Sequence, residues 1–592
     1  MDFDYNVRGN LGLGNPINTI LQNRGISNTG AFLNPSKKNM ENAHLLDNID
    51  LAVDLFLNHM NNSTTVTVLQ DCDCDGITSA ALIILYINEH FPKIKVDYII
   101  HNGKEHGLDS KTMSKIISSM PDLLIIPDAG SNDLRELKKL KQLGIDVIVL
   151  DHHDKSKKTA RLQSIYHLDD FNAFGVIVNN QFSTNVKDKS MTGVGIVYKF
   201  CLVIDERLGT NTANKYLDLV ALGMIADICD LTQLQTRYLV LEGIKQIQEA
   251  TNENKFISEL VKSQAFVLHN KVTILGIGWY IAPLINSLIR LGTPDDKQIL
   301  MKAFLNDTSK VVMKIRGKGE QEISIQECAR RLCEKYKRTQ KKLTEDYTNI
   351  LIAQVDEYDL NSYPVICCKA SDDFTNTFTG LIANKLKSLY QKPSLVLREN
   401  ENILVGSARG FEESRIKDIK SFCQKSKLFK LVEGHPNACG VHIKIDKISE
   451  FYEYLAKQET DNKLHYDVDA KFTNSTLNAT WINLISEYSE VWGNNIAEPV
   501  FAIELTFTIS DSNFKLIGAD KTTIKILYQN IEIIKFKTTE AEYKNIKCLG
   551  SDIKFIIIGK FSINEFRGNK TPQIVVENWQ YEVSKSKSKF RF

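Results

Sequence analysis

The chain has 592 residues and a formal net charge of +1 at pH 7. Its length is too great for one hydrophobic core and predicts three or four domains. Eleven cysteines are scattered without paired Cys-x-x-Cys spacing, which excludes a zinc ribbon and a disulfide framework and favours the reducing cytoplasm. No apolar run approaches a membrane span, and the polar start of residues 1–5 does not fit a signal peptide, so we expect no membrane association.

The first 320 residues predict a helical cap followed by a large α/β domain. Residues 1–60 are typical of short helices, and we expect them to cover the next domain. Strand-like apolar runs then alternate with helical ones, at 65–70, 96–100, 123–127 and 146–150. This alternation predicts a mainly parallel sheet with helices on both faces over residues 61–320.

The most informative stretch is residues 65–76, a β-branched run that ends in three alternating aspartates and a glycine. In an extended segment Asp71, Asp73 and Asp75 point to the same side. Three carboxylates that lie so close repel one another, and they predict a hard cation of the magnesium or manganese type. A calcium loop of the EF-hand type is excluded because its twelfth position is Leu82 and a strand-like segment precedes it.

Acidic and imidazole residues recur after later apolar runs. Residues 123–127 are followed by Asp128, residues 146–150 by Asp151, His152 and His153, and residues 219–226 by Asp227. We expect all three runs to be strands, and parallel strands place their carboxyl ends at one edge of the sheet. A single aspartate after a strand usually caps a helix, but the repeated pattern favours a site for two divalent ions.

The rest of the chain predicts three more segments. Residues 321–348 lack Gly and Pro and predict a long linker helix, whose basic residues, Lys337 among them, face either phosphates or solvent. Residues 349–462 mix helices with expected strands at 350–354, 364–368, 394–398 and 402–406. Residues 463–592 carry several β runs between Gly and Asn turns, which predict a small barrel.

These motifs, in this order, resemble those of the DHH phosphoesterase superfamily, and more closely those of the RecJ family of single-strand-specific DNA exonucleases. The segments that carry the superfamily resemblance are residues 71–76, 128–130, 151–153 and 226–227. Supporting segments of the RecJ type are residues 23–25, 32–35, 105–108, 192–199, 282–286, 406–409 and 434–440. The resemblance covers nearly the whole chain, and it implies a DHH-associated domain at 349–462 and an OB-fold at 463–592.

The resemblance also implies a metal site with two manganese or magnesium ions. The implied ligands are Asp71, Asp73, Asp128, His152 and Asp227, with Asp128 as the bridge. The implied supporting residues, which orient these ligands, are Asp75, Asp151 and His153. One departure is Leu69, which stands where many relatives have a histidine ligand, so we expect the first metal to bind more weakly.

The resemblance further implies residues that bind the substrate. These are Arg290, Ser407, Arg409 and His435, and a hydroxyl beside a guanidinium suits a terminal phosphate. The residues just before Arg290 are bulkier than the family pattern, which leaves the placement of its guanidinium open.

The expected function is that of a monomeric exonuclease that degrades single-stranded DNA from the 5′ end and releases mononucleotides, in DNA repair and recombination. Its expected partners are single-stranded DNA and either a single-strand-binding protein or a helicase. A phosphodiesterase of short oligonucleotides or cyclic dinucleotides is one alternative, and the C-terminal barrel weighs against it. A catalytically weak replication scaffold is another, and the nearly complete ligand set weighs against it.

Overall fold

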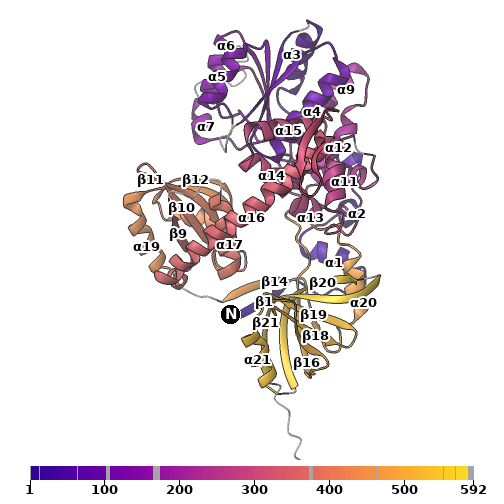
Figure 1. Cartoon of the computed structure of the whole chain (residues 1–592), viewed down its shortest axis with the longest axis vertical. Coiled ribbons are helices and arrows are strands. Elements are labelled where there is room, and N and C mark those ends of the chain that lie inside the picture. The colour runs from indigo at the N-terminus through magenta and orange to yellow at the C-terminus, as the bar shows by residue number, and fades with distance from the viewer. Residues whose placement is uncertain are drawn as a thin grey trace, which may run out of the picture. The chain divides into compact units, whose positions relative to one another are not determined.

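The computed structural model describes residues 2–583, except 13, 63, 102–106, 164–173, 252, 372–377, 460–462, 551 and 567. The chain divides into two compact units (Figure 1). One unit, called here the catalytic unit, comprises Gly30–Gln340 and Glu490–Ala497. The other, called the second unit, comprises Met1–Thr29, Lys341–Ser489 and Glu498–Phe592. The long helix α16 (Ile325–Glu357) contributes residues to both.

The catalytic unit is built on a five-stranded sheet in the order β3-β2-β4-β5-β6, and all its pairs are parallel. Its strands are β2 (Val66–Gln70), β3 (Val96–Ile100), β4 (Leu123–Pro127), β5 (Asp146–Asp151) and β6 (Val176–Asn179). The predicted parallel sheet is therefore confirmed. Because β3 and β4 flank β2 on opposite sides, the strand order reverses between β2 and β4, and such a switch point opens a crevice at the carboxyl ends.

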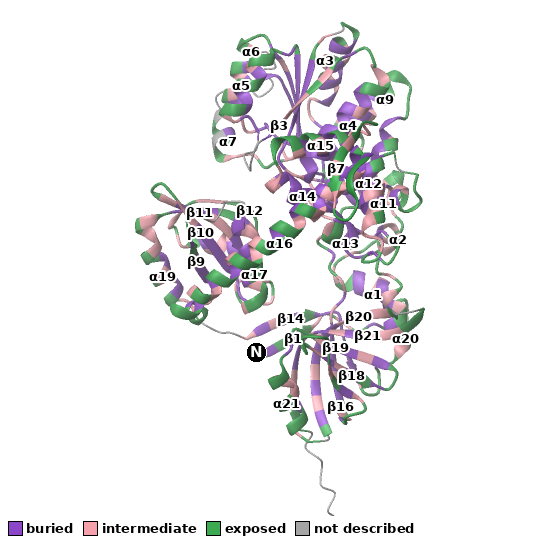
Figure 2. Cartoon of the chain, in the orientation of Figure 1, coloured by how far each residue is buried: buried purple, intermediate pink, exposed green. Residues whose placement is uncertain are grey.

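Helices cover both faces of this sheet, and the neighbouring strands β2 and β4 are fully buried (Figure 2). Helices α5 (Ser110–Ser119) and α6 (Leu134–Gln142) pack on one face, in a core cluster that includes Leu69 and Leu124. The other helices near the sheet are α3 (Ile49–Asn61), α4 (Cys74–His90), α9 (Gly193–Leu208) and α10 (Leu217–Ala226).

The prediction of a strand at residues 219–226 is wrong, because these residues form most of helix α10. Nearly every residue of this helix is buried, and a segment that is apolar on all sides has the same hydrophobic pattern as a buried strand. The remaining helices of the catalytic unit are α2 (Thr29–Leu33), α7 (Lys157–Gln163), α11 (Leu234–Gln248), α12 (Lys255–Ser263), α13 (Ile274–Gly276), α14 (Ala282–Leu291) and α15 (Pro294–Phe304). A π-helical turn, η4 (Ile277–Ile281), joins α13 to α14.

The segment Ile274–Leu291 has the length and mean hydropathy of a membrane span, and the expectation that no run approaches a span overlooked it. Within the described helices it is the one that meets this test, and 56% of it is buried inside the protein. Such partial burial is typical of a core helix, so the segment is weak evidence for a membrane.

Helix α16 begins and ends later than the predicted linker of residues 321–348. The hairpin of β7 (Lys310–Ile315) and β8 (Gly319–Ser324) precedes it. Residues 350–354, predicted as a strand, are helical, because no helix breaker interrupts the chain before the left-handed residue Asp359.

The smaller α/β domain of the second unit has a five-stranded mixed sheet in the order β12-β13-β11-β10-β9. Its strands are β9 (Ile366–Ala370), β10 (Ser394–Asn400), β11 (Ile403–Arg409), β12 (Phe429–His435) and β13 (Ala438–Lys444). Its helices are α17 (Thr379–Tyr390), α18 (Ile419–Lys425) and α19 (Ile448–Ala456).

The C-terminal domain has a seven-stranded mixed sheet in the order β15-β16-β20-β21-β19-β18-β17, as the predicted barrel requires. Its strands are β15 (Ala470–Thr473), β16 (Phe501–Thr508), β17 (Phe514–Ile517), β18 (Thr523–Tyr528), β19 (Ile531–Phe536), β20 (Asp552–Phe566) and β21 (Asn569–Val583). Two helices, α20 (Ala479–Ser486) and α21 (Glu540–Cys548), belong to it.

The N-terminal segment departs from the predicted cap. Strand β1 (Phe3–Val7) pairs in parallel with β14 (Leu464–Val468), and helix α1 (Pro16–Asn23) lies in the same unit. Residues 1–29 therefore cluster with the C-terminal part of the chain, and only the later residues of the expected cap belong to the catalytic unit. A strand pairing that spans over four hundred residues leaves no local sequence signal.

The buried carboxylate of Asp469 binds the N-terminal segment through Arg24. Asp469 is fully buried and accepts hydrogen bonds from Arg24 Nε (2.7 Å), Arg24 Nη2 (2.6 Å) and the backbone N–H of Val500 (3.0 Å). Arg8 also reaches it, at 3.4 Å and with a side chain that is 34% exposed. The bidentate Arg24 contact compensates the cost of burying this charge.

We predict that Arg24→Ala lowers the free energy of unfolding by about 3 kcal/mol, because it leaves the buried Asp469 charge with only the longer contact to Arg8 and one backbone N–H. The matched control is Arg8→Ala, which removes a more exposed and longer contact and is expected to cost less than about 1 kcal/mol. The urea midpoint of the full chain measures both. Equal shifts for the two variants would contradict a special role for Arg24.

Candidate metal centre

The predicted metal residues lie at the switch point of the catalytic sheet. Asp71 follows β2 and Asp128 follows β4, and these two strands are neighbours. Their side chains are almost fully buried, with exposed fractions of 1% and 2%. The geometry of a parallel sheet thus brings together carboxylates that are 57 positions apart, as the sequence predicts.

The first acidic motif does not continue as a strand. Its chain turns into α4, so that Asp73 is the N-cap residue and accepts a hydrogen bond from Gly76 N (3.0 Å), while Asp75 lies in the first helical turn. The prediction that Asp71, Asp73 and Asp75 point to the same side of an extended segment is therefore wrong. A Cβ on Gly76 would lie 2.7 Å from Asp71 Cβ, so only glycine permits this close approach.

Asp75 is anchored at the beginning of α9. Its carboxylate accepts hydrogen bonds from Thr192 Oγ1 (2.9 Å), Gly193 N (2.7 Å) and Val194 N (3.2 Å). Burial nevertheless raises the pKa of Asp75, because these donors offset only part of the cost of a buried charge. A Cβ on Gly193 would lie 2.4 Å from Asp128 Cβ, so the same helix terminus closes against Asp128.

His152 joins the strand ends to helix α10. Its Nε2 lies 3.1 Å from Asp128 Oδ1, 3.5 Å from Asp227 Oδ2 and 3.9 Å from Asp75 Oδ2. Asp227 is the C-cap residue of α10, so the end of a helix, and not a strand, places this carboxylate near His152. Candidate ligand atoms of Asp75, His152 and Asp227 all lie within 4.8 Å of one another, a suitable spacing for a shared cation.

Asp151 has a different environment. It accepts hydrogen bonds from the backbone N–H groups of Ser131 (3.0 Å) and His152 (2.7 Å) and from His153 Nδ1 (2.7 Å). Burial alone would raise the pKa of Asp151, but the His153 and His152 rings and the Ser131 N–H lower it far below its ordinary value. Asp151 is thus held ionised as an orienting group.

Asp128 carries the strongest electrostatic cost. Burial, and then the charges of Asp75, Asp73, Asp71 and Asp227, raise the pKa of Asp128 well above its ordinary value of 3.8. Its backbone is left-handed at φ 65°, and its buried Oδ1 accepts no hydrogen bond of normal geometry, although His152 Nε2 lies 3.1 Å away. An acidic cluster around an unsatisfied carboxylate oxygen is the donor set that a hard divalent cation prefers, so these residues fit the implied metals.

Leu69, at the position of the missing histidine, belongs to the core cluster beneath α5 and α6 and offers no ligand. The expected weakening of the first metal site stays a prediction. Sequence reasoning gave no individual role to Thr192 or Gly193, although each lies within a quoted motif, and it expected of Gly76 only a sharp turn. Their close approaches depend on the packing of α9 and α4, which no local pattern reveals.

Three cations lie on helices beside this centre. Arg290 ends α14, Lys297 lies on α15 and Lys337 on α16. Burial lowers the pKa of Arg290, and the charges of Asp73 and Cys72 act on it in the opposite sense. Burial and then the charge of Arg290 lower the pKa of Lys337. When the charge of one cation lowers the pKa of its neighbour, a bound anion between the two is favoured.

The other predicted substrate residues lie together in the second unit. Thr379 Oγ1 contacts Ser407 Oγ at 3.0 Å, and a Cβ on Gly380 would lie 2.6 Å from Arg409 Nη2. Both residues therefore adjoin the first turn of α17. Ala438 on strand β13, which lies between β11 and β12, pairs with Arg409 on one side and with the exposed His435 on the other, so the register places these three residues in one row.

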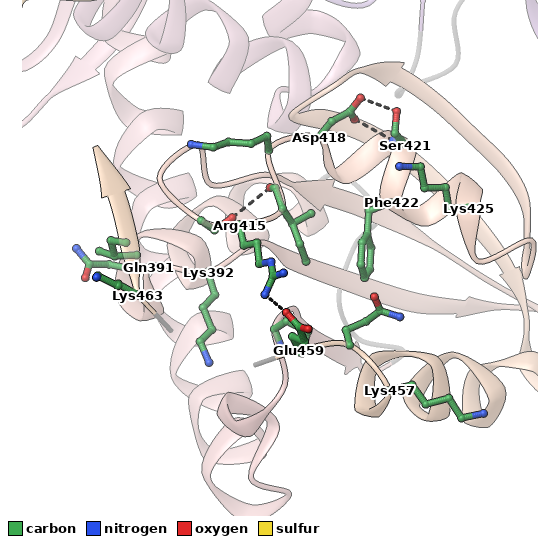
Figure 3. A pocket seen from close by; sticks show the side chains of 16 residues that line it. Gln391, Lys392, Arg415, Asp418, Ser421, Phe422, Lys425, Lys457, Glu459 and Lys463 are labelled. Carbon is green, nitrogen blue, oxygen red and sulfur yellow. Dashed lines mark hydrogen bonds and ion pairs between the residues drawn. The ribbon is translucent and has the colours of Figure 1, made fainter. Parts of the chain in front are cut away.

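The second unit also contains a cavity of about 600 Å³ that includes none of the predicted residues. Basic side chains such as Lys392, Arg415 and Lys457 line it (Figure 3). Arg415 forms an ion pair with Glu459, and Asp418 caps α18 through Ser421 N (2.9 Å). Because its lining contains none of the acidic and imidazole residues of the metal centre, the cavity is not a candidate for the chemistry.

The sheet topology and the acidic centre at its switch point define a DHH-type phosphoesterase. The model of the DHH family N-terminal domain matches residues 65–224, and that of the RecJ OB domain matches residues 468–578. A relative from Bacillus subtilis, called a putative prophage-derived single-strand DNA-specific exonuclease YorK, is 35% identical over 597 residues, which cover 99% of this chain and 98% of the relative.

Two further comparisons agree with this match. The single-stranded-DNA-specific exonuclease RecJ of Haemophilus influenzae is 24% identical, with 94% of each chain covered. The crystal structure of RecJ from Thermus thermophilus in complex with Mn²⁺ superposes with a TM-score of 0.71 at 18% identity, covering 95% of this chain and 75% of that one. The chain therefore belongs to the RecJ family, which confirms the resemblance and the fold class predicted from the sequence.

We predict that Asp128→Asn stabilises the metal-free protein at neutral pH by about 1 kcal/mol or more, because the amide cannot ionise. The pKa of Asp128 is raised in the folded state, so its contribution is present below pH 3.8 and is lost as the pH rises through the folded pKa. The gain over the wild type should accordingly be absent near pH 4 and grow toward neutrality. Thermal unfolding in EDTA measures it.

The same variant should lose most of the rise in melting temperature that Mn²⁺ gives the wild type. The control is Asp154→Asn, which neutralises an exposed carboxylate three positions after Asp151. We expect it to unfold like the wild type in both conditions. A full manganese response in Asp128→Asn would contradict its place in the metal centre.

Proposed function

We propose that this chain is a metal-dependent exodeoxyribonuclease, specific for single-stranded DNA, that acts from the 5′ end and releases 5′ mononucleotides. The observation that carries the proposal is the unsatisfied Asp128 carboxylate at the centre of an acidic cluster at the sheet switch point. Membership of a family named for single-strand-specific exonucleases supports the substrate.

The proposed ligands of two manganese or magnesium ions are Asp71, Asp73, Asp128, His152 and Asp227. When bound, such ions lower the pKa of a coordinated water and stabilise charge on the attacking and leaving oxygens of a phosphodiester. Asp128, whose neighbours include all the other carboxylates of this set, suits the bridging position.

The supporting residues fix the orientation of these ligands. Asp75 is held by the beginning of α9 and lies 3.9 Å from His152 Nε2, so it limits where the imidazole can move. Asp151 holds the His153 ring and accepts the backbone N–H of His152. With its main chain and its ring contacts fixed, His152 presents Nε2 toward Asp128 and Asp227.

The proposed 5′ direction depends on recognition of a terminal phosphate. Ser407 and Arg409 supply a hydroxyl and a guanidinium beside the N-terminus of α17, which favours an anion. His435 adds an imidazole in the same row of the sheet as Arg409. We assign Arg290 to a backbone phosphate at the metal centre, because the charge of Asp73 acts on its guanidinium. Both contacts make binding weaker at high salt.

The proposal extends to the oligomeric state, the compartment and the partners of the protein. The protein would work as a monomer in DNA repair or recombination, in the cytoplasm, beside a single-strand-binding protein or a helicase. All eleven cysteines are free, which supports a reducing compartment. The match to the RecJ OB domain favours long single strands over short oligonucleotides or cyclic dinucleotides.

The test uses 5′-phosphorylated single-stranded DNA that is labelled at either end, with Mn²⁺. We expect mononucleotides to appear from the 5′ label first, whereas duplex DNA stays intact. Asp128→Asn should lower the rate by at least about a thousandfold with the fold retained, because it removes charge where the ions bind. Binding without cleavage by the wild type would instead indicate a scaffold.

We further predict that Arg409→Ala reduces the preference for a 5′-phosphate over a 5′-hydroxyl by about tenfold in kcat/KM, through the loss of a charge-assisted hydrogen bond. The control is Arg415→Ala, in the same domain, whose guanidinium is occupied by Glu459. It should keep the preference of the wild type. Equal loss in both variants would indicate a general charge effect.

A further inference from the structure

An exposed apolar surface adjoins the metal residue Asp227. It consists of Ile228, Trp279 and Tyr280, whose exposed fractions are 59%, 72% and 44%, and it is called here the apolar rim. Exposed aliphatic and aromatic side chains in such proximity usually mark a binding site. None of the three residues has a role in the metal centre described above.

Ile228 adopts a backbone conformation that disfavours it. It follows the C-cap Asp227 at φ 58°, and its N–H donates to Ile225 O (3.3 Å) while Cys229 N donates to Met224 O (3.1 Å). These two bonds define a Schellman motif, whose left-handed position is usually glycine. A β-branched residue is strained there, so an exposed isoleucine at this position indicates selection for its side chain.

Trp279 and Tyr280 lie in the π-helical turn η4, which packs on the same end of α10. A Cβ on Gly278 would lie 3.5 Å from Ile225 Cγ2, so the turn contacts the residue whose carbonyl accepts the Ile228 N–H. The helix that continues from η4 ends near Arg290. Single π turns occur often at functional sites, and this one lies against the end of α10 that carries Asp227 and has two exposed aromatic residues.

Resting on the proposed function, we infer that the apolar rim stacks the base of a nucleotide adjacent to the scissile phosphate. A strand whose phosphate reaches Asp227 would bring its neighbouring bases to the C-terminal end of α10, where Ile228 follows Asp227. Every base has an apolar face, so stacking on Trp279 against Ile228 suits binding without sequence preference. Trp492 and Trp579 are buried and Trp481 is partly buried, which leaves Trp279 as the exposed indole of the described chain.

The test compares two 5′-phosphorylated oligothymidylates in EDTA, one ordinary and one with abasic residues at its 5′ end. Trp279→Ala should weaken binding of the ordinary strand about tenfold and leave binding of the abasic strand unchanged. Quenching of indole fluorescence by the ordinary strand should also be lost. The control Tyr358→Ala removes another exposed aromatic ring, 61% exposed in the second unit, and should bind like the wild type.

Ile228→Gly separates stacking from a folding defect. Glycine relieves the strained conformation, so the variant should have a higher melting temperature and yet bind the ordinary strand more weakly than the wild type. If it and Trp279→Ala both bind ordinary and abasic strands as the wild type does, the inference is overturned, even when the wild type degrades DNA from the 5′ end. If the wild type binds without cleaving and Trp279→Ala still loses base-dependent binding, the proposed function fails and the stacking surface stands.

Discussion

The mutual repulsion of carboxylates at one buried sheet edge governs the catalytic unit. Asp71, Asp75 and Asp128 are almost fully buried, and the other charges around Asp128 are acidic as well. A fold that only needed stability would separate these groups or supply arginines. Here the chain instead brings them closer, since glycines at 76 and 193 admit approaches that any side chain would block. The arrangement is favourable only when a cation neutralises it.

The environment of each carboxylate then determines its chemical task. Asp128 and Asp151 follow neighbouring parallel strands, yet the pKa of one is raised and that of the other is lowered. The difference arises from their neighbours, because Asp151 accepts hydrogen bonds from N–H groups and the His153 ring, whereas four other aspartates surround Asp128 and its contact with the His152 ring does not offset them. One edge of one sheet thus contains a carboxyl group whose pKa is lowered and another whose pKa is raised.

Sequence reasoning reached this centre because its signals are local. Apolar β-branched runs followed by acidic residues predict the strands. Because parallel pairing places the carboxyl ends of these strands at one edge, the sequence also predicts that Asp71, Asp128 and His152 meet. It failed where a pattern has two readings, as in residues 219–226 and 350–354, both of which are helical. It also failed where partners are remote, as in the pairing of β1 with β14.

The roles of the site residues are less accessible to sequence than their convergence. Asp73 and Asp75 belong to a helix cap and a first turn, so their directions depend on how α4 packs against α9. Arg409 and His435 align through the register of three strands, which no spacing in the sequence encodes. Their assignment to a phosphate therefore rests on family resemblance together with this register.

Two buried aspartates in this chain show how structure and function can be told apart. Asp469 is paired with a bidentate arginine and a backbone N–H, as expected for a carboxylate that holds segments together. Asp128 is equally buried, yet one of its oxygens accepts no hydrogen bond of normal geometry and its backbone is left-handed. Both departures cost stability, and the strained, exposed Ile228 beside Asp227 adds a third. Because these costs gather around one crevice, the crevice is built to bind rather than to stabilise the fold.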